Sequence, residues 1–310
     1  MRLQIRDDRQ MRSLTGLSLT QFDILLEVFT KIYHQIQWQA YQEGILAGTR
    51  QRRPGGGQKG ALPRMKDKLL FVLYYFKVYP TFDVLGTQFN MARSKANENL
   101  HKLVPVLYQT LVHLEVMPQR EFATPDELLE ALAGLDTILI DVTERNYRRP
   151  QDNQEQQEHY SGKKKRHTLK NTVIATLEKM ILFLGKTFAG HTHDYTMLKE
   201  EFPPEQAWFE LVKVLVDLGY QGIVKDYVGD EIHLPHKKPR KSKKNPTPSL
   251  TDQQKADNQA LSKIRIFVEN AICGLKRYNI LVHRFRNHKE SFDDDVIGIA
   301  AALWNFNLSY

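Results

Sequence analysis

The stretch Thr137-Ile138-Leu139-Ile140-Asp141 decides the predicted fold, because it is a short apolar run that ends on an acid. Similar short runs occur at residues 172–175, 181–184 and 211–216, bounded by polar residues or glycine. Runs of this kind are typical of buried strands in an α/β sheet. We therefore expect residues 130–310 to form an α/β domain with a mixed sheet flanked by helices.

Two of these predicted strands lead directly into an aspartate. Asp141 follows the first run, and Asp217 follows the last. An aspartate after a strand is usually a turn or capping residue. However, side chains at the carboxyl ends of neighbouring parallel strands are held rigidly at the edge where α/β sheets bind ligands. The recurrence of the pattern favours a site that contains both carboxylates.

A third acid lies on the helix that we expect at about 258–278. At 100° per residue, one stripe of this helix is apolar and predicts its core face. That stripe contains Ile264, Phe267, Val268, Ala271, Leu275 and Tyr278. A second stripe carries Arg265, Glu269 and Lys276, about a third of a turn away. A surface ion pair between Arg265 and Glu269 is the simpler interpretation, but the two strand aspartates favour a cleft-lining face.

The three carboxylates Asp141, Asp217 and Glu269 predict a particular metal chemistry. The chain has one cysteine, Cys273, so neither a cysteine-rich zinc site nor an internal disulfide is expected. We expect Cys273 to be a small buried residue in a cytoplasmic protein. Hard oxygen ligands suit Mg²⁺ or Mn²⁺, and two such ions about 4 Å apart support phosphoryl transfer.

The residues before the sheet predict helices. We expect an N-terminal helical segment at 1–50, a Gly/Arg linker at 51–61 and a helix-turn-helix region at 62–120. Within that region, the helix 82–89, a turn at 90–91 and the helix 92–116 make the motif, whose second helix can enter a major groove. Its exposed face would offer Arg93, Ser94, Lys95, Asn97, Asn99 and Lys102. Solvated polar residues on a helix surface are the alternative.

The charge balance favours a polyanionic partner. The chain has 44 Lys+Arg against 36 Asp+Glu, a formal net charge of +8, which favours nucleic acid. One basic run, on a predicted hairpin near Asp141, contains Lys163, Lys164, Lys165, Arg166 and Lys170. Another, in a basic insertion at about 230–257, contains Lys237, Lys238, Arg240, Lys241, Lys243 and Lys244. For any one lysine of this insertion, a solvated loop explains the residue as well as a DNA-phosphate contact does. The sequence predicts neither a leader peptide nor a membrane span.

Five motifs in order resemble the insertion-sequence transposases of the DDE type, over roughly residues 60–305. They are the acidic motif at 140–144 with Arg148-Arg149-Pro150, the block at 160–170, the turn at 190–194, the second acidic motif at 216–222, and the spacing of Arg265, Glu269 and Lys276. The pattern is similar to that of the fifth insertion-sequence family. One departure is Ser262, where related enzymes often carry a tyrosine.

The resemblance implies a ribonuclease H-like catalytic domain that cuts and rejoins DNA strands with divalent metal ions. It implies that Asp141, Asp217 and Glu269 are the catalytic metal ligands and that Arg265 and Lys276 are accessory DNA contacts. It also implies a helix-turn-helix upstream and a dimer or larger assembly on DNA, in a prokaryotic cytoplasm.

Three points stay open from the sequence. We expect Asp194 to be a helix N-cap outside the catalytic set, and His193 either to support the site or merely to lie beside it. The segment 14–48 could either mediate oligomerisation or cover the catalytic core. A catalytically silent DNA-binding protein or regulator, or a ribonuclease H-like nuclease without strand transfer, is the alternative to a transposase.

Overall fold

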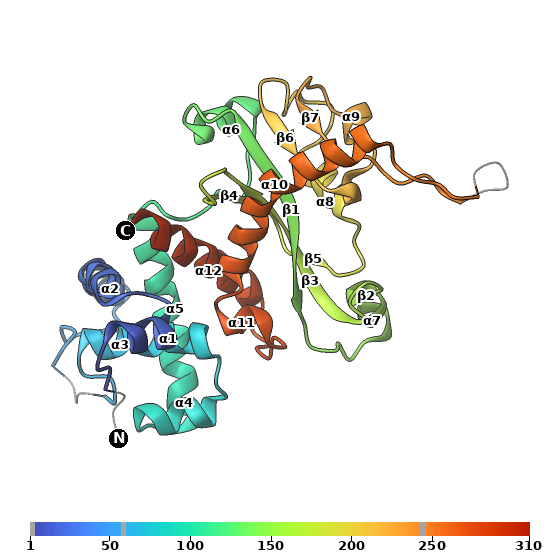
Figure 1. Ribbon diagram of the computed structural model, residues 1–310. Helices are drawn as coiled ribbons and strands as arrows, with labels where there is room; N and C mark the ends of the chain where they lie inside the picture. The colour runs from blue at the N-terminus through green and yellow to red at the C-terminus, as the bar shows by residue number, and fades with distance from the viewer. Residues whose placement is uncertain (1–3, 57–59, 242–245) are drawn as a thin grey trace. The chain divides into compact units, whose positions relative to one another are not determined.

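The computed structural model describes residues 4–56, 60–241 and 246–310 (Figure 1). The chain divides into two compact units. Unit 1 contains residues 1–117, 277–283 and 289–310, and unit 2 contains residues 118–276 and 284–288. Lys243, Lys244 and residues 57–59 of the predicted linker lie outside the described residues. Among the helices of the described ranges, none is both long and apolar enough to cross a membrane.

Unit 1 is built from helices. They are α1 (Asp8–Thr15), α2 (Leu19–Leu46), α3 (Met65–Val78), α4 (Phe82–Phe89), α5 (Arg93–His113), α11 (Asn279–Val282) and α12 (Phe292–Ser309). Helix α3 lies at the centre, because every residue from 69 to 76 is buried. Helix α12 packs on α5, and Asn305 Nδ2 donates to the carbonyl of Val116 at 3.1 Å. From the sequence, α12 was expected within the α/β domain at 130–310. An apolar helix face does not reveal which core it packs against, and α12 packs within unit 1.

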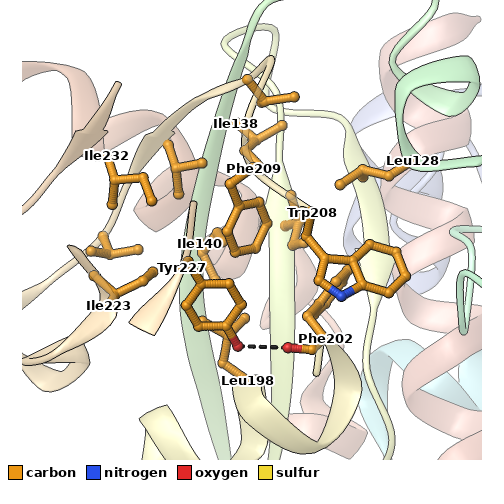
Figure 2. Close-up of a cluster of buried hydrophobic side chains, with 14 of the residues drawn as sticks. Leu128, Ile138, Ile140, Leu198, Phe202, Trp208, Phe209, Ile223, Tyr227 and Ile232 are labelled. Carbon is orange, nitrogen blue, oxygen red and sulfur yellow. Dashed lines mark hydrogen bonds between the residues drawn. The ribbon is translucent and has the colours of Figure 1, made fainter. Parts of the chain in front are cut away.

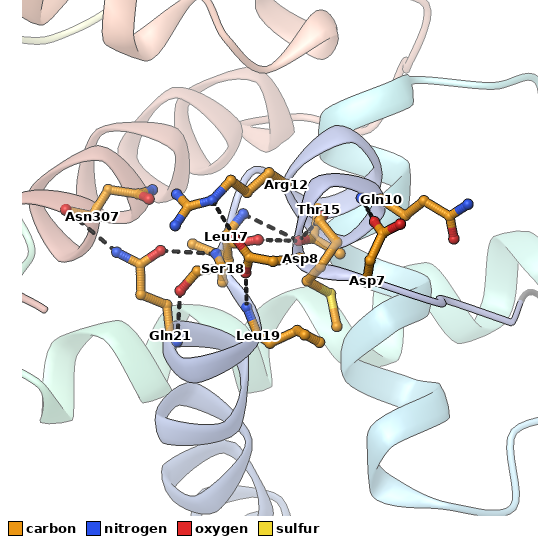
Figure 3. A network of polar contacts seen from close by, with 11 residues as sticks. Asp7, Asp8, Gln10, Arg12, Thr15, Leu17, Ser18, Leu19, Gln21 and Asn307 are labelled. Atoms are coloured by element: carbon orange, nitrogen blue, oxygen red, sulfur yellow. Dashed lines mark hydrogen bonds and ion pairs between the residues drawn. The ribbon is translucent and has the colours of Figure 1, made fainter.

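A polar network fixes the corner between α1 and α2 (Figure 3). Ser18 and Gln21 form a capping box at the start of α2. Asp8 accepts from the Leu19 amide at 2.7 Å and pairs with Arg12. Gln21 Nε2 also donates to the carbonyl of Asn307 at 3.4 Å, so the same corner is tied to α12.

The helix-turn-helix is present as predicted, with α4, a tight turn and α5. Asn90 ends α4 in the left-handed conformation with φ 55°. A Cβ on Gly86 would lie 2.5 Å from the carbonyl oxygen of Met91, so glycine lets the turn pass close to the helix. Arg93 and Lys95 lie exposed in the first turn of α5.

Unit 2 is the mixed sheet with its helices. Its strands are β1 (Thr137–Asn146), β2 (Tyr160–Ser161), β3 (Arg166–Ala175), β4 (Ile181–Leu184), β5 (Phe188–Ala189), β6 (Lys213–Leu215) and β7 (Ile232–His233). Its helices are α6 (Pro125–Leu132), α7 (Asn153–His159), α8 (Asp194–Glu201), η1 (Leu218–Tyr220), α9 (Ile223–Asp226) and α10 (Asp252–Leu275).

Strand β1 is the centre of this sheet. It pairs antiparallel with β3, which pairs antiparallel with β4, and it pairs parallel with β6, which pairs parallel with β7. An antiparallel meander extended by parallel strands on the other side of its first strand is the ribonuclease H-like arrangement. The predicted α/β fold class is therefore confirmed, including the helical region before the sheet.

The two faces of β1 have different surroundings. Ile138 and Ile140 belong to an aromatic-rich core that includes Trp208 and Phe209 (Figure 2). Removing each of these large side chains from water contributes about 2–3 kcal/mol. Because side chains alternate along a strand, Asp141 lies on the opposite face, and α10 packs on β1 and β3. The sheet thus holds Asp141 with a hydrophobic layer behind it.

Candidate active site

Asp141 and Asp217 lie at equivalent positions of two paired strands. The parallel register aligns Leu139 with Leu215, so each aspartate comes two residues after an aligned pair. Asp141 lies within β1, which continues to Asn146, and Asp217 lies two residues beyond the end of β6, as the N-cap of η1. The strand that carries Asp141 is therefore longer than the apolar run predicted, and the two carboxylates lie at matching positions just past the end of β6.

Asp141 is largely buried, with 21% of its side chain exposed. The pKa of Asp141 is raised to about 6, mainly by burial and to a lesser extent by the charges of Asp217 and Asp194, while the Val142 amide and Arg265 oppose the rise. Asp141 Oδ1 accepts from the Val142 amide at 2.8 Å. A carboxylate in this environment is stabilised by any cation placed beside it.

The loop after β6 fixes the second carboxylate. Asp217 Oδ1 accepts from the Gly219 amide at 2.6 Å. A Cβ on Gly219 would lie 2.8 Å from that same oxygen and 3.4 Å from Asp194 Oδ2. Glycine at this position therefore leaves space for two carboxylates around one Cα atom.

Helix α10 supplies the third acid and a cation between the acids. Arg265 Nη2 lies 3.7 Å from Asp141 Oδ2 and 4.0 Å from Glu269 Oε1. The Arg265 side chain is 17% exposed, whereas that of Glu269 is 57% exposed. The buried Nε of Arg265 has no hydrogen-bond partner among the described residues. This guanidinium bridges the sheet and helix acids and retains a free donor.

Lys276, immediately after α10, also faces this region. Burial lowers the pKa of Lys276, and Lys164 lowers it further, while Glu144 and Asp141 act in the opposite direction. These charges place Lys276 and Lys164 near the acidic cluster. Glu144 was not predicted as part of it. Glu144 Oε1 accepts from Thr168 Oγ1 at 2.7 Å across the β1–β3 pair.

The acids do not form a ready-made metal site in the described part of the chain, since no three acidic, histidine or cysteine side chains converge as ion ligands. Without a cation, close carboxylates repel one another, and Arg265 provides the positive charge between Asp141 and Glu269. The donor set nevertheless fits hard divalent ions, because all three side chains offer carboxylate oxygens.

The predicted basic hairpin joins β2 to β3. Lys163, Lys164, Lys165 and Arg166 are exposed, and the Lys165 amide donates to the carbonyl of Ser161 at 2.8 Å to close the turn. Lys170 differs from them, because its Nζ donates to Asp194 Oδ1 and to the carbonyl of Thr192, both at 2.8 Å. Its side chain is 14% exposed.

The other predicted DNA contacts lie on exposed surfaces. In unit 1, Arg93 pairs at 3.9 Å with Asp83, and Lys95 at 2.9 Å with Glu98. In unit 2, an extended segment between β7 and α10 leaves the sheet (Figure 1). Its described part carries four exposed basic side chains, those of Lys237, Lys238, Arg240 and Lys241.

Three expectations for individual residues were wrong. His193, not Asp194, is the N-cap of α8, and its side chain accepts from the Tyr195 amide. Cys273 is exposed rather than buried. Tyr278 lies beyond the end of α10, in unit 1. The sequence shows only that Asp194 is an acid. Its position beside Asp217 depends on the packing of α8 against the loop after β6.

Comparison with known proteins gives concordant matches. A family described as "DDE superfamily endonuclease" matches residues 140–305, and "Helix-turn-helix of DDE superfamily endonuclease" matches residues 61–112. The chain is 30% identical over 304 residues to a "Probable transposase for insertion sequence element IS702" from Microchaete diplosiphon, covering 97% of this chain and 95% of that protein. No solved structure matches.

Proposed function

Since the chain belongs to the DDE superfamily endonucleases and is a DNA transposase, we propose that Asp141, Asp217 and Glu269 form its metal-binding active site. The observation that carries this proposal is the equivalent position of Asp141 and Asp217, each two residues after the paired Leu139 and Leu215 of two parallel strands. Glu269 joins them through Arg265, which contacts both Asp141 and Glu269. The recognition of the family from five motifs is confirmed.

Enzymes of this family use divalent metal ions, and we assign two Mg²⁺ or Mn²⁺ ions to this chain. Bound ions would activate the attacking oxygen and stabilise the leaving oxygen during phosphoryl transfer. The acids of the chain would hold them. Asp141 and Asp217 are fixed by the sheet and the loop after β6, whereas Glu269 is exposed and would have to approach them.

The basic residues around the acids would orient the DNA. Arg265 has a buried Nε, without a hydrogen-bond partner in the part of the chain that the structure describes, that can donate to a phosphate oxygen. Lys276 and Lys164 add positive charge near the same acids, and Lys163 and Lys165 are exposed on the turn that carries Lys164. Phosphate contacts of this kind position a duplex without reading its sequence. We assign Arg93 and Lys95 of α5 to groove contacts, and the lysines and arginine at 237–241 to the DNA backbone.

The reaction is strand cleavage at the ends of an insertion sequence, followed by strand transfer into a target. We propose that both steps use the same carboxylates, in a dimer or larger assembly that joins two ends. The silent DNA-binding alternative is not favoured, because all three acids are present and the matches are to endonucleases and a transposase.

The test is cleavage of DNA carrying the terminal repeats of the element, with Mg²⁺, by wild type and by Asp141→Asn, Asp217→Asn and Glu269→Gln. Each substitution should reduce cleavage by more than about 100-fold, beyond the loss typical of a residue outside the ligand set. Asp226→Asn is the matched control, because Asp226 accepts from Tyr195 and pairs with Lys199. Cleavage that persists in any of the three variants would refute the assignment of that acid.

A further inference from the structure

A fourth carboxylate, that of Asp194, lies beside the proposed active site. Asp194 is the first residue of α8. Its Oδ1 accepts from Lys170 Nζ at 2.8 Å, and the two side chains are 29% and 14% exposed. Lys170 also donates to the carbonyl of Thr192 at 2.8 Å. Two short bonds therefore turn this ammonium group inward, toward the start of α8.

The other oxygen of Asp194 faces the loop that carries Asp217. A Cβ on Gly219 would be 3.4 Å from Asp194 Oδ2 and 2.8 Å from Asp217 Oδ1. Both carboxylates therefore approach the same backbone atom from different elements. The negative charge of Asp194 also acts on Asp141, in the same direction as that of Asp217. Asp194 thus lies beside the loop of Asp217 and adds its charge to that of Asp217 at Asp141, while its own charge is paired with Lys170.

A buried hydroxyl group lies within the electrostatic reach of these three acids. Tyr220 is fully buried, and its hydroxyl has no hydrogen-bond partner among the described residues. The charges that act on it most strongly are those of Asp141, Asp194 and Asp217. A buried polar group without a hydrogen-bond partner destabilises the folded state. Such a group in a native structure indicates an additional hydrogen-bonding occupant, and the water shell of a cation would provide one.

We propose that Asp194 is a fourth carboxylate of the active site, binding a hydrated divalent cation together with Asp141 and Asp217, and that Lys170 is a positioning residue that holds Asp194 there. The inference rests on the proposed function, because it places the cation at the acids assigned above. It gives Lys170 a role through Asp194 in place of a direct DNA contact. A purely structural role for Asp194 at the start of α8 would explain neither its proximity to the loop of Asp217 nor the buried Tyr220 hydroxyl.

The first test is Mn²⁺ binding to the full chain without DNA, measured by isothermal titration calorimetry. Asp194→Asn should weaken binding about 10-fold, as is typical when a supporting residue of a metal site is removed. Asp217→Asn should weaken it more, and Asp226→Asn should bind as the wild type does. Wild-type affinity in Asp194→Asn, with weakened binding in Asp217→Asn, would overturn the inference and leave the proposed function intact. Wild-type affinity in Asp217→Asn would contradict the proposed site itself.

Thermal unfolding separates a site role from a structural role. In EDTA, Asp194→Asn and wild type are compared without metal, and Mn²⁺ is then added to each. The proposal expects a smaller Mn²⁺-induced rise of Tm in the variant, since a ligand stabilises the folded state according to its affinity. A lower Tm in EDTA together with an unchanged Mn²⁺-induced rise would assign Asp194 to the fold alone.

The second test concerns Lys170. Lys170→Gln should weaken Mn²⁺ binding about threefold or more in the wild type and leave it unchanged in Asp194→Asn, because coupled residues are not additive. In EDTA, the salt dependence of DNA affinity should be unchanged in Lys170→Gln, whereas Lys164→Gln should reduce the slope by about one. A reduced slope in Lys170→Gln, or an equal effect on Mn²⁺ binding in both backgrounds, would overturn the positioning role.

Discussion

The two acids on either side of Arg265 occupy opposite environments. Asp141 lies on a strand that is paired on both sides, with 21% of its side chain exposed, whereas Glu269 lies on a helix face with 57% exposed. The proposed site thus has a fixed, dehydrated half on the sheet and an exposed half on α10 and the basic hairpin. We infer that the sheet half sets the position of the chemistry and that the exposed half responds to DNA and metal.

Among substitutions outside the three acids, the largest loss of cleavage should come from adding a methyl group beside Asp217, in the sheet half of the proposed site. Gly219→Ala would place a methyl group 2.8 Å from Asp217 Oδ1, the oxygen that accepts from the Gly219 amide at 2.6 Å, so this bond and the methyl group compete for the same space. We expect DNA cleavage to fall about 10- to 100-fold, the range seen when the support of metal-ligating groups is disturbed. Cleavage rates at saturating Mg²⁺ check this prediction. Gly60→Ala is the control, because nothing lies within 4 Å of a Cβ there; equal rates in both variants would contradict a rigid Asp217.

The next prediction distinguishes Asp141 from Glu269 by the effect of each on the free energy of unfolding. In the folded, metal-free protein the pKa of Asp141 is about 6, above its ordinary value of 3.8. Between these values the folded state binds more protons than the unfolded state, so the Asp141 contribution to stability falls as pH rises from about 4 to 6. Removing this ionisable group with Asp141→Asn should therefore raise the free energy of unfolding by about 1–3 kcal/mol at pH 8, with little gain at pH 4.

Urea unfolding in EDTA at pH 4 and pH 8 measures this difference. Glu269→Gln is the comparison, and an exposed substitution of this kind should change stability by less than about 0.5 kcal/mol at either pH. A stability gain at pH 8 as large for Glu269→Gln as for Asp141→Asn would contradict the division into a buried half and an exposed half.

The smallest effect should come from the exposed hairpin. Single substitutions of Lys163, Lys164 or Lys165 by glutamine should each reduce the slope of log affinity against log salt by about one, if the replaced lysine neutralises one phosphate. Affinity should fall to a similar degree on terminal-repeat DNA and on unrelated DNA, because phosphate contacts carry no sequence information. Fluorescence anisotropy over a series of salt concentrations measures both quantities. A reduction confined to the terminal repeats would instead assign base recognition to this turn.

Much of the fold was predictable because its signals are local. The run at 137–140 and the one at 181–184 have the periodicity and length of buried strands, and both are strands. The helix-turn-helix was predictable from the turn at 90–91 between two periodic segments. The packing of α12 in unit 1 was not, because an all-round apolar helix is compatible with any core.

The site was predictable only where acids follow strands or share a motif. Asp141 and Asp217 were proposed from the apolar runs that precede them, and Glu269 needed the helix stripe and the family spacing. Asp194 and Tyr220 were missed as parts of this region, since their proximity depends on how α8 and the loop after β6 pack. The inward bond of Lys170 to Asp194 was missed for the same reason: a basic run does not reveal which of its members is already paired.

The central claim, that acids from the sheet and from α10 share one metal site, is tested most directly by iron-mediated cleavage of the protein backbone. Fe²⁺ would replace the native ion in the DNA-bound protein, and ascorbate with peroxide would generate radicals that cut the chain nearby. We predict cuts close to Asp141, Asp217 and Glu269 together, suppressed by excess Mg²⁺. Cuts near Asp141 and Asp217 without any near Glu269, or cuts confined to segments away from these three acids and Asp194, would contradict this claim.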